Sequence, residues 1–71
     1  MSRQLRTDLE HVKSIIQKHI AMHQDLVRKF KTELDRETEN PEHVRNEEEM
    51  ICRNEAIIEA LQGILKEIES I

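Results

Sequence analysis

The single proline of the chain, Pro41, lies between two long segments whose apolar residues recur at helical spacing. Proline disrupts the interior of a helix but is favoured in its first turn, and Asn40 directly before it is a preferred N-cap residue. The 71 residues contain one Gly and one Phe and neither Trp nor Tyr, a composition that does not suit the turns and strands of a sheet. We therefore predict an all-α fold with a helix over about 3–36, a turn over 37–40 and a helix over about 41–70.

The first segment carries its apolar residues three and four positions apart, which is the pattern of one face of a long helix. The series consists of Leu5, Leu9, Val12, Ile16, Ile20, Val27, Phe30 and Leu34, with His23 at the same spacing. Thr7 has Glu10 three residues later, as in a capping box, so Thr7 and Ser2 are candidate caps for the start of this helix.

The second segment follows a seven-residue repeat to the end of the chain. One heptad position holds Val44, Ile51, Ile58 and Leu65, and a second holds Glu47, Asn54, Leu61 and Ile68. Two such helices joined by a short turn are expected to pack as an antiparallel, coiled-coil-like hairpin that forms one domain. Residues 1–40 carry eight Lys and Arg against seven Asp and Glu, and residues 41–71 carry three against eight, so the two helices attract each other weakly.

The register of the hairpin follows from pairing heptad positions across a turn centred near residues 38 and 39, so that paired residue numbers sum to 77. His23 then meets Asn54 in a polar layer within an apolar seam, an arrangement that fixes register at a cost in stability. The other predicted pairs are Leu9 with Ile68, Val12 with Leu65, Ile16 with Leu61, His19 with Ile58, and Leu26 with Ile51.

A two-helix hairpin buries one stripe on each helix, so apolar residues beside that stripe stay in water unless another chain covers them. They are Ile15 and Met22 in the first helix and Met50, Ile57, Ile64 and Ile71 in the second, with the small residues Ala56, Ala60 and Gly63 next to them. Glycine within a helix costs about 1 kcal/mol relative to alanine, which the close approach of another helix would offset. We predict that a partner chain is bound by Ile15, Met22, Ile57, Ala60, Gly63 and Ile64.

The composition disfavours several classes of function. A formal net charge of −4 argues against binding to nucleic-acid phosphates, no apolar run is long enough to insert into a bilayer, and the charged N-terminus does not resemble a secretory signal. The lone Cys52 excludes a disulfide framework and suits a reducing compartment, so the chain is expected to be cytoplasmic. A hairpin also offers no concave pocket with convergent polar groups, so no enzymatic activity is predicted.

Three groups of reactive side chains have structural explanations that we favour. His19 and His23 stand four residues apart, as metal ligands can, but the pattern places no third ligand, so neither a metal nor another cofactor is predicted. Cys52 has no basic cluster to activate it and is expected to be an inert, partly exposed thiol. The run of Glu47, Glu48 and Glu49 is expected to form a solvated face.

The chain resembles the small co-chaperone subunits of type III secretion systems, of the YscE/PscE/EscE type. The resemblance rests on Glu33-Leu34 shortly before the turn, on Pro41-Glu42-His43 at the start of the second helix, and on the stretch EAIIEALQGIL over 55–65. In architecture it covers nearly the whole chain. Val44 stands where some relatives carry an aromatic residue, and the second helix is about one turn longer before its small residues.

The resemblance implies a virulence-associated function in the bacterial cytoplasm. The hairpin would bind and stabilise a tetratricopeptide-like partner chaperone, and the pair would keep the needle subunit monomeric before export. An alternative is a homodimer in which two hairpins form a four-helix bundle and act as a regulator or adaptor through protein–protein contact. A bundle that holds a metal or haem through His19 and His23 is a further alternative.

Overall fold

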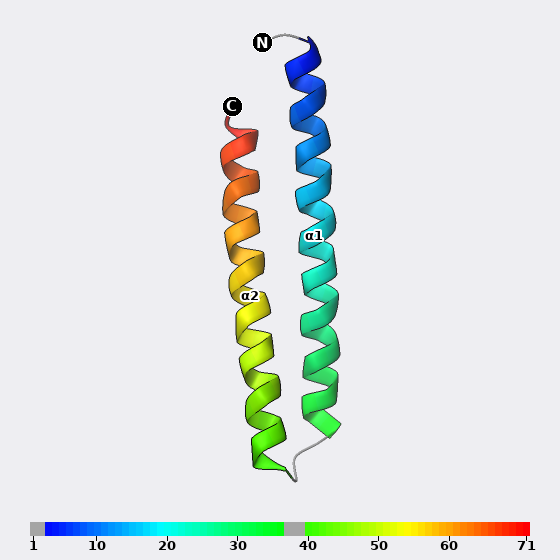
Figure 1. The fold of residues 1–71 in the computed structure, drawn as a ribbon, viewed down its shortest axis with the longest axis vertical. Helices are drawn as coiled ribbons and strands as arrows, with labels where there is room; N and C mark the ends of the chain where they lie inside the picture. The colour runs from blue at the N-terminus through cyan, green and yellow to red at the C-terminus, as the bar shows by residue number, and fades with distance from the viewer. Residues whose placement is uncertain (1–2, 37–39) are drawn as a thin grey trace.

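The chain folds into two long helices that lie side by side and run in opposite directions (Figure 1). The computed structural model describes residues 3–36 and 40–71. Helix α1 spans Arg3–Arg36 and helix α2 spans Pro41–Glu69, and no strand occurs within these ranges. The hairpin measures 58 × 14 × 12 Å. The predicted all-α hairpin and the bounds of its helices are confirmed, whereas positions 37–39 of the predicted turn lie outside the described residues.

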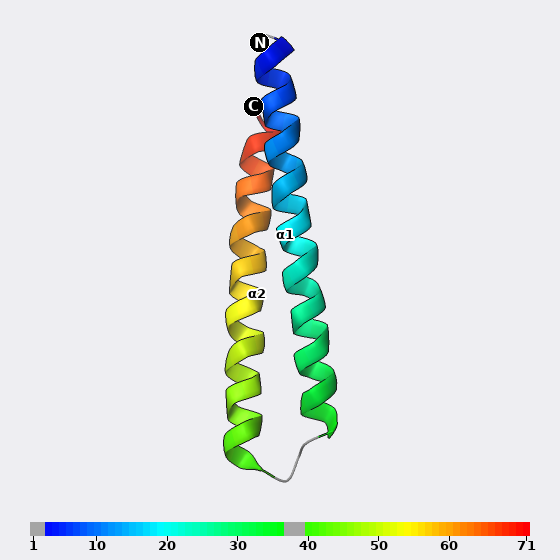
Figure 2. The same ribbon diagram turned by 45° about the vertical axis from the view of Figure 1, so that its right-hand side comes forward.

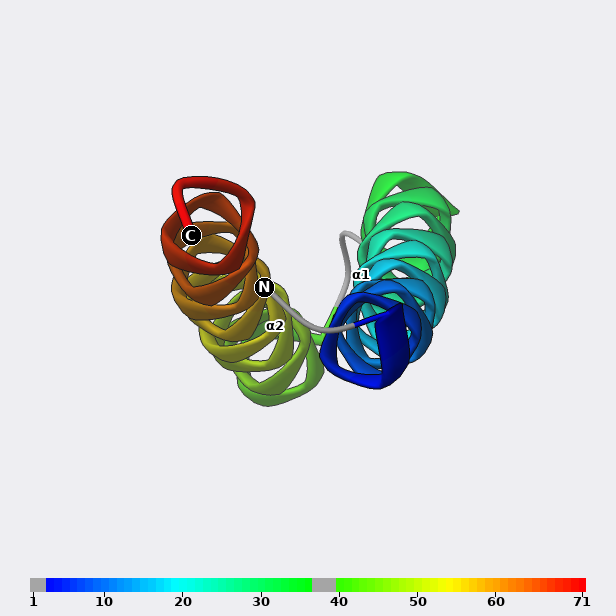
Figure 3. The same ribbon diagram turned by 90° about the horizontal axis from the view of Figure 1, so that it is seen from above.

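The two helices remain neighbours along the shared part of their length when the hairpin is turned by 45° (Figure 2). Viewed along the long axis, they form two columns that lean past each other, so they cross at an angle (Figure 3). Such a crossing is typical of helices whose side chains interdigitate along a seven-residue seam. The N-terminal end of α1 extends beyond the C-terminal end of α2 (Figure 1).

The start of α2 is defined by Asn40, as the sequence predicts. Its backbone is extended, with φ −110° and ψ 103°, and its side chain accepts hydrogen bonds from the backbone N–H groups of Glu42 and His43 at 3.1 and 3.4 Å. Pro41 occupies the first helical turn, where the missing N–H costs nothing, and the backbone N–H of Val44 donates to the Asn40 carbonyl at 3.0 Å. Helix α2 therefore begins with a complete N-cap.

The start of α1 differs from the predicted capping box. Thr7 lies inside the helix, and its hydroxyl donates to the backbone carbonyl of Arg3 at 3.0 Å. A threonine that bonds back to the preceding turn in this way is a helix-interior residue rather than a cap. The other candidate cap, Ser2, lies outside the described residues.

The seam between the helices contains the residues of both predicted stripes, with one correction in α1. Its buried apolar residues are Ile20, Val27 and Ile51, and half-buried residues extend it in both directions: Leu9, Ile16, Phe30 and Leu34 in α1, and Val44, Ile58, Leu61, Leu65 and Ile68 in α2. Leu5, Val12 and His19 were predicted to face α2 but are exposed. Helix α1 is rotated about its axis relative to the prediction. Ile20 therefore replaces His19, and Val27 replaces Leu26, in the contacts with α2.

The seam is thin. Among the described residues, no large side chain is completely removed from solvent. The half-buried Lys13 contributes to the seam with its aliphatic stem, while its ammonium group reaches Glu10 at 3.4 Å. Most of the apolar side chains that form the seam therefore remain partly exposed to water.

Candidate functional site

The polar layer of the seam has the predicted partners. Nδ1 of His23 lies 2.8 Å from Oδ1 of Asn54, and the side-chain amide of Asn54 donates to the Met50 carbonyl at 2.8 Å. Because the amide nitrogen of Asn54 is used on Met50, its oxygen is the acceptor toward His23, whose Nδ1 therefore carries the proton. This contact confirms the predicted pairing of His23 with Asn54, whose residue numbers sum to 77, whereas Ile20 and Val27 replace His19 and Leu26 in the neighbouring pairs.

A second buried polar residue lies nearer the turn. Glu47 is 4% exposed, so it belongs to the seam and not to the solvated face predicted for it, whereas Glu48 and Glu49 are exposed. Nε2 of His43 approaches Oε1 of Glu47 to 2.8 Å, but without hydrogen-bond geometry. Among the residues that the structure describes, neither carboxylate oxygen of Glu47 accepts a hydrogen bond.

The two flanks of the seam differ in chemical character, and heptad spacing assigns each exposed residue to one of them. Glu33 in α1 and His43 in α2 face the same side, since they line one hollow together. Counting back or forward by sevens places Leu5 and Val12 with Glu33, and Met50, Ile57 and Ile64 with His43. Ile71 follows the end of α2 and lines a different hollow, together with Glu10 and Glu69. Ile15 and Met22 lie next to Val12 on the same side of α1, at the i+3 spacing.

We call this side the apolar flank, and it contains all but one of the exposed large apolar residues of the described chain. They are Leu5, Val12, Ile15 and Met22 in α1, and Met50, Ile57 and Ile64 in α2; the exception is Ile71, after the end of α2. A hairpin with scattered exposed residues would need no explanation, but seven residues gathered on one side form a surface suited to another protein.

The predicted partner-binding residues divide between this flank and the back of α2. Ile15, Met22, Ile57 and Ile64 are 44%, 47%, 37% and 48% exposed on the apolar flank, and the exposed Ala60 lies between Ile57 and Ile64 at the i+3 and i+4 spacings. Gly63 lies one position beyond them, on the side of α2 away from α1, and a Cβ added there would meet no atom within 4 Å. Sequence reasoning did not include Leu5 and Val12, because it assigned them to the seam.

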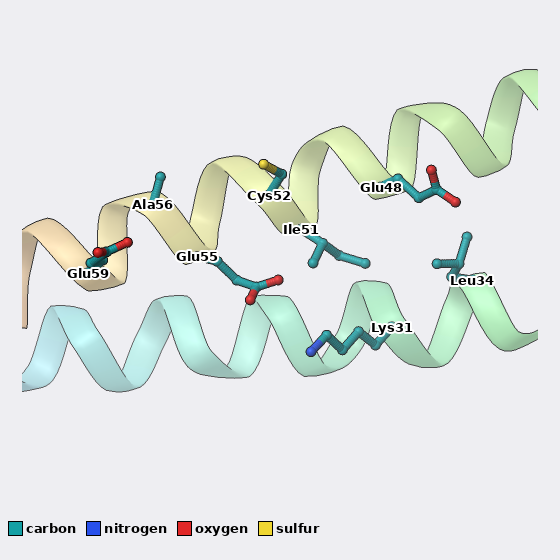
Figure 4. A pocket seen from close by; sticks show the side chains of 8 residues that line it. All are labelled: Lys31, Leu34, Glu48, Ile51, Cys52, Glu55, Ala56 and Glu59. Carbon is teal, nitrogen blue, oxygen red and sulfur yellow. The ribbon is translucent and has the colours of Figure 1, made fainter.

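The opposite side, the polar flank, carries a shallow hollow (Figure 4). Lys31 and Leu34 of α1 line it together with six residues of α2, namely Glu48, Ile51, Cys52, Glu55, Ala56 and Glu59. Ile51 and Glu55 point toward α1 in this view, while Cys52 and Ala56 lie on the far side of α2 (Figure 4). The only apolar side chains of any size here, Ile51 and Leu34, belong to the seam, so this hollow offers little to an apolar ligand.

The reactive side chains form no constellation in the described part of the chain. No group of three or more His, Cys, Asp or Glu residues in 3–36 and 40–71 is arranged to hold a metal ion. His19 is exposed, and Nδ1 of His23 is engaged by Asn54. The thiol of Cys52 is exposed and reduced.

Neither helix contains, within the described residues, a stretch that is long and apolar enough to span a bilayer. No family model, curated protein or solved structure matches the chain. The apolar flank is therefore the feature of the described chain that best indicates a function.

Proposed function

We propose that the hairpin is a co-chaperone that binds a tetratricopeptide-like chaperone through its apolar flank, and that the pair keeps a type III secretion needle subunit monomeric before export. The single observation that carries the binding part of this proposal is that seven of the eight exposed large apolar residues of the described chain lie on one side. The identity of the partner rests on the resemblance of Pro41-Glu42-His43 and the 55–65 stretch to co-chaperones of that class.

The shape of the flank suits a helical partner. Its apolar side chains recur at intervals of three, four and seven residues along two helices, and they form ridges that the grooves of another helix can receive. Tetratricopeptide repeats are stacked pairs of helices that present extended surfaces of this kind. Ala60, between Ile57 and Ile64, leaves a low point in the ridge where such a helix can approach.

Because the seam is thin, binding of a partner would add substantially to the stability of the hairpin. A single small core of this type supplies about 3–5 kcal/mol at most, and burial of each Ile or Met adds about 1.5–3 kcal/mol. Docking of the apolar flank would therefore add as much stabilisation as the whole free hairpin has. The partner would gain similarly, which is the relation expected between a co-chaperone and the chaperone it stabilises.

The experiment is co-expression of the chain with a tetratricopeptide-like chaperone encoded next to it and with the needle subunit, followed by size-exclusion chromatography. We expect one complex of the three chains. Ile57→Asp combined with Ile64→Asp should weaken binding to the chaperone by at least 100-fold, because two buried side chains are lost and two charges are desolvated. Far-ultraviolet circular dichroism should show that this variant remains helical.

The matched control places the same charges on the other flank. Ser14→Asp with Ala21→Asp adds two carboxylates seven residues apart, at exposed positions of α1 that adjoin Ile15 and Met22 but face the polar flank. Binding by this variant should stay within about threefold of the original chain. A chaperone that elutes apart from the unmodified hairpin contradicts the proposed partner, and equal loss of binding in both variants contradicts the assignment of the flank.

A further inference from the structure

The free hairpin exposes more surface than its mass predicts. A compact monomer of 8.5 kDa exposes about 4,700 Å², whereas this chain exposes 5828 Å². The difference is comparable to the roughly 800 Å² that each partner contributes to a stable interface of standard size. Covering the apolar flank would bring the exposed surface back to the range of a compact protein.

Four charged residues bracket the central part of this flank, which holds Val12, Ile15 and Met22 on α1 and Ile57, Ala60 and Ile64 on α2, and they are arranged by sign. Leu5 and Met50 lie outside them. On α1, Asp8 lies seven residues before Ile15 and Lys29 lies seven residues after Met22. On α2, Arg53 precedes Ala60 by seven residues and Glu67 follows it by seven. Glu33 and Arg36 also lie on this side near the turn, and their opposite charges cancel. The flank is therefore acidic toward the open end of the hairpin and, in net charge, basic toward the turn.

Among the residues that the structure describes, none forms an ion pair with these four charges. All four are exposed, and the ion pairs between described residues involve other side chains: Lys13 with Glu10, Arg28 with Asp25, and His43 with Glu47. Asp8 accepts one hydrogen bond, from the side-chain amide of Gln4 at 3.3 Å. The bracketing charges are thus available to a second molecule.

The charges on both helices are symmetric about one level of the hairpin. The midpoint between Asp8 and Lys29 falls between residues 18 and 19, and the midpoint between Arg53 and Glu67 falls at Ala60. The contact between His23 and Asn54 sets the register that places Ala60 opposite residue 17. The two midpoints therefore coincide to within about 3 Å along the helix axis.

Consider two copies related by a two-fold axis at this level, which lies in the interface perpendicular to the helices. On both helices, the acidic end of one copy then faces the basic end of the other. This axis places α1 of one copy against α1 of the other, so that Asp8 meets Lys29, and α2 against α2, so that Glu67 meets Arg53. The alternative axis, parallel to the helices, would bring Asp8 against Glu67 and Lys29 against Arg53. Self-complementarity of one patch about a two-fold axis is the requirement for a closed dimer.

We infer that two copies of the chain pair through the apolar flank, with their turns at opposite ends, and form an antiparallel four-helix bundle. The apolar residues provide the stabilisation, and the bracketing charges select the antiparallel arrangement over the parallel one. This pairing involves the chain alone, so it holds or fails independently of the proposed chaperone. If both hold, the chaperone replaces the second copy on the same surface.

Sedimentation equilibrium of the full chain with charge-exchange variants tests the inference. The unmodified chain should show a concentration-dependent equilibrium between monomer and dimer. Asp8→Lys with Glu67→Lys, and separately Lys29→Glu with Arg53→Glu, should each raise the dissociation constant at least tenfold, because attraction becomes repulsion at four contacts. All four substitutions together should return it to within about threefold of the original value.

A matched control is Asp35→Lys with Glu59→Lys, which makes the same change of charge at exposed positions of the polar flank and should alter the dissociation constant less than threefold. Circular dichroism should show equal helicity for all variants. A strict monomer at the highest attainable concentration would overturn the inference. A dimer that the single exchanges do not weaken, or that the combined exchange does not restore, would overturn the antiparallel arrangement.

Discussion

The contact between His23 and Asn54 trades stability for register. Each side chain satisfies the other in a seam that would otherwise be apolar, and Asn54 is 5% exposed. Exchange of a satisfied polar pair for well-packed apolar residues is often neutral or stabilising, whereas loss of one partner leaves a buried polar group unpaired. Exchange of both residues for apolar ones would, however, remove the polar layer that fixes the register of the two helices.

We expect His23→Leu combined with Asn54→Leu to raise the free energy of unfolding by about 1 kcal/mol or more. His23→Leu alone should change it by less than about 1 kcal/mol, because the gain in apolar contact offsets the unpaired oxygen of Asn54. Thermal unfolding of both variants and of the original chain, with and without chelator, provides the measurement. Chelator should have no effect, and a chelator-induced fall in the midpoint of the original chain that His23→Leu abolishes would establish a metal site.

Glu47 places a carboxylate where burial is costly, since its oxygens accept no hydrogen bond within the described chain and its neighbour His43 is about half exposed. We expect Glu47→Leu to stabilise the hairpin by about 1–3 kcal/mol, because a buried carboxyl group whose oxygens accept no hydrogen bond within the described chain is replaced by apolar contact. Urea unfolding measures the change. Glu48→Leu, at the adjacent exposed position, is the control and should stay within about 0.5 kcal/mol; an equal gain there would contradict the burial argument.

Gly63 weakens α2 in the free hairpin. An added Cβ would meet no atom within 4 Å, and alanine in a helix interior is favoured over glycine by about 1 kcal/mol. We expect Gly63→Ala to stabilise the free chain by about that amount in urea unfolding, and Ala56→Gly, seven residues earlier and equally exposed, to destabilise it similarly. If Gly63 contacts a partner, as the sequence predicts, Gly63→Ala should also weaken binding; unchanged affinity would remove Gly63 from the binding surface.

Asn40 determines where α2 begins, because its side-chain oxygen accepts hydrogen bonds from two backbone N–H groups of the first turn. We expect Asn40→Ala to cost about 1 kcal/mol of stability, and Asn40→Asp, which keeps the accepting oxygen, to cost less than half as much. The unfolding midpoints of the two variants give the comparison. Equal losses would mean that the cap is not what stabilises this end of the helix.

The sequence allowed the bounds of both helices and their register to be predicted, because Asn40-Pro41 and the seven-residue repeat of α2 leave few alternatives. It did not decide the rotation of α1. Apolar residues lie on both edges of its stripe, with Val12 and Leu26 on one edge and Ile20 and Val27 on the other, so two rotations satisfy the same spacing. Packing against α2 selects the second edge, and Val12 is left on the apolar flank.

The candidate site could be predicted only in part for the same reason. Residues that α2 leaves exposed follow directly from its strict repeat, and Ile57 and Ile64 are exposed as expected. Leu5 and Val12 depend on the rotation of α1 and were missed.

Burial is unevenly distributed along the hairpin. The buried residues Ile20, Val27, Glu47, Ile51 and Asn54 all lie in the half nearer the turn, and the open end is held by half-buried contacts. Regions with few buried contacts open at lower free energy than the global unfolding reaction. We expect amide hydrogen exchange to be slowest around residues 20–27 and 47–54 and at least tenfold faster around residues 5–12 and 61–68. Uniform protection would contradict this gradient.

The uneven burial along the hairpin also predicts how association changes amide hydrogen exchange. The apolar flank extends from Leu5 to Met22 on α1 and from Met50 to Ile64 on α2, so a partner that covers it would reach the open end that the seam leaves weak. Amide exchange around residues 5–12 and 61–68 should therefore slow markedly when a partner or a second copy binds, while the turn half changes little. Slowing confined to the turn half would place the interface elsewhere.

The pairing of residues across the seam, seen in the contact of His23 with Asn54, also governs how the length of this protein can change. One residue inserted in α2 would rotate every following side chain by about 100° and exchange flank residues with seam residues. Seven residues inserted in each helix at the same level, after Ile16 and after Ala60, would preserve all pairs and both flanks while adding about 10 Å. The hairpin can thus serve as a spacer whose reach is adjustable in fixed steps, without any redesign of its ends.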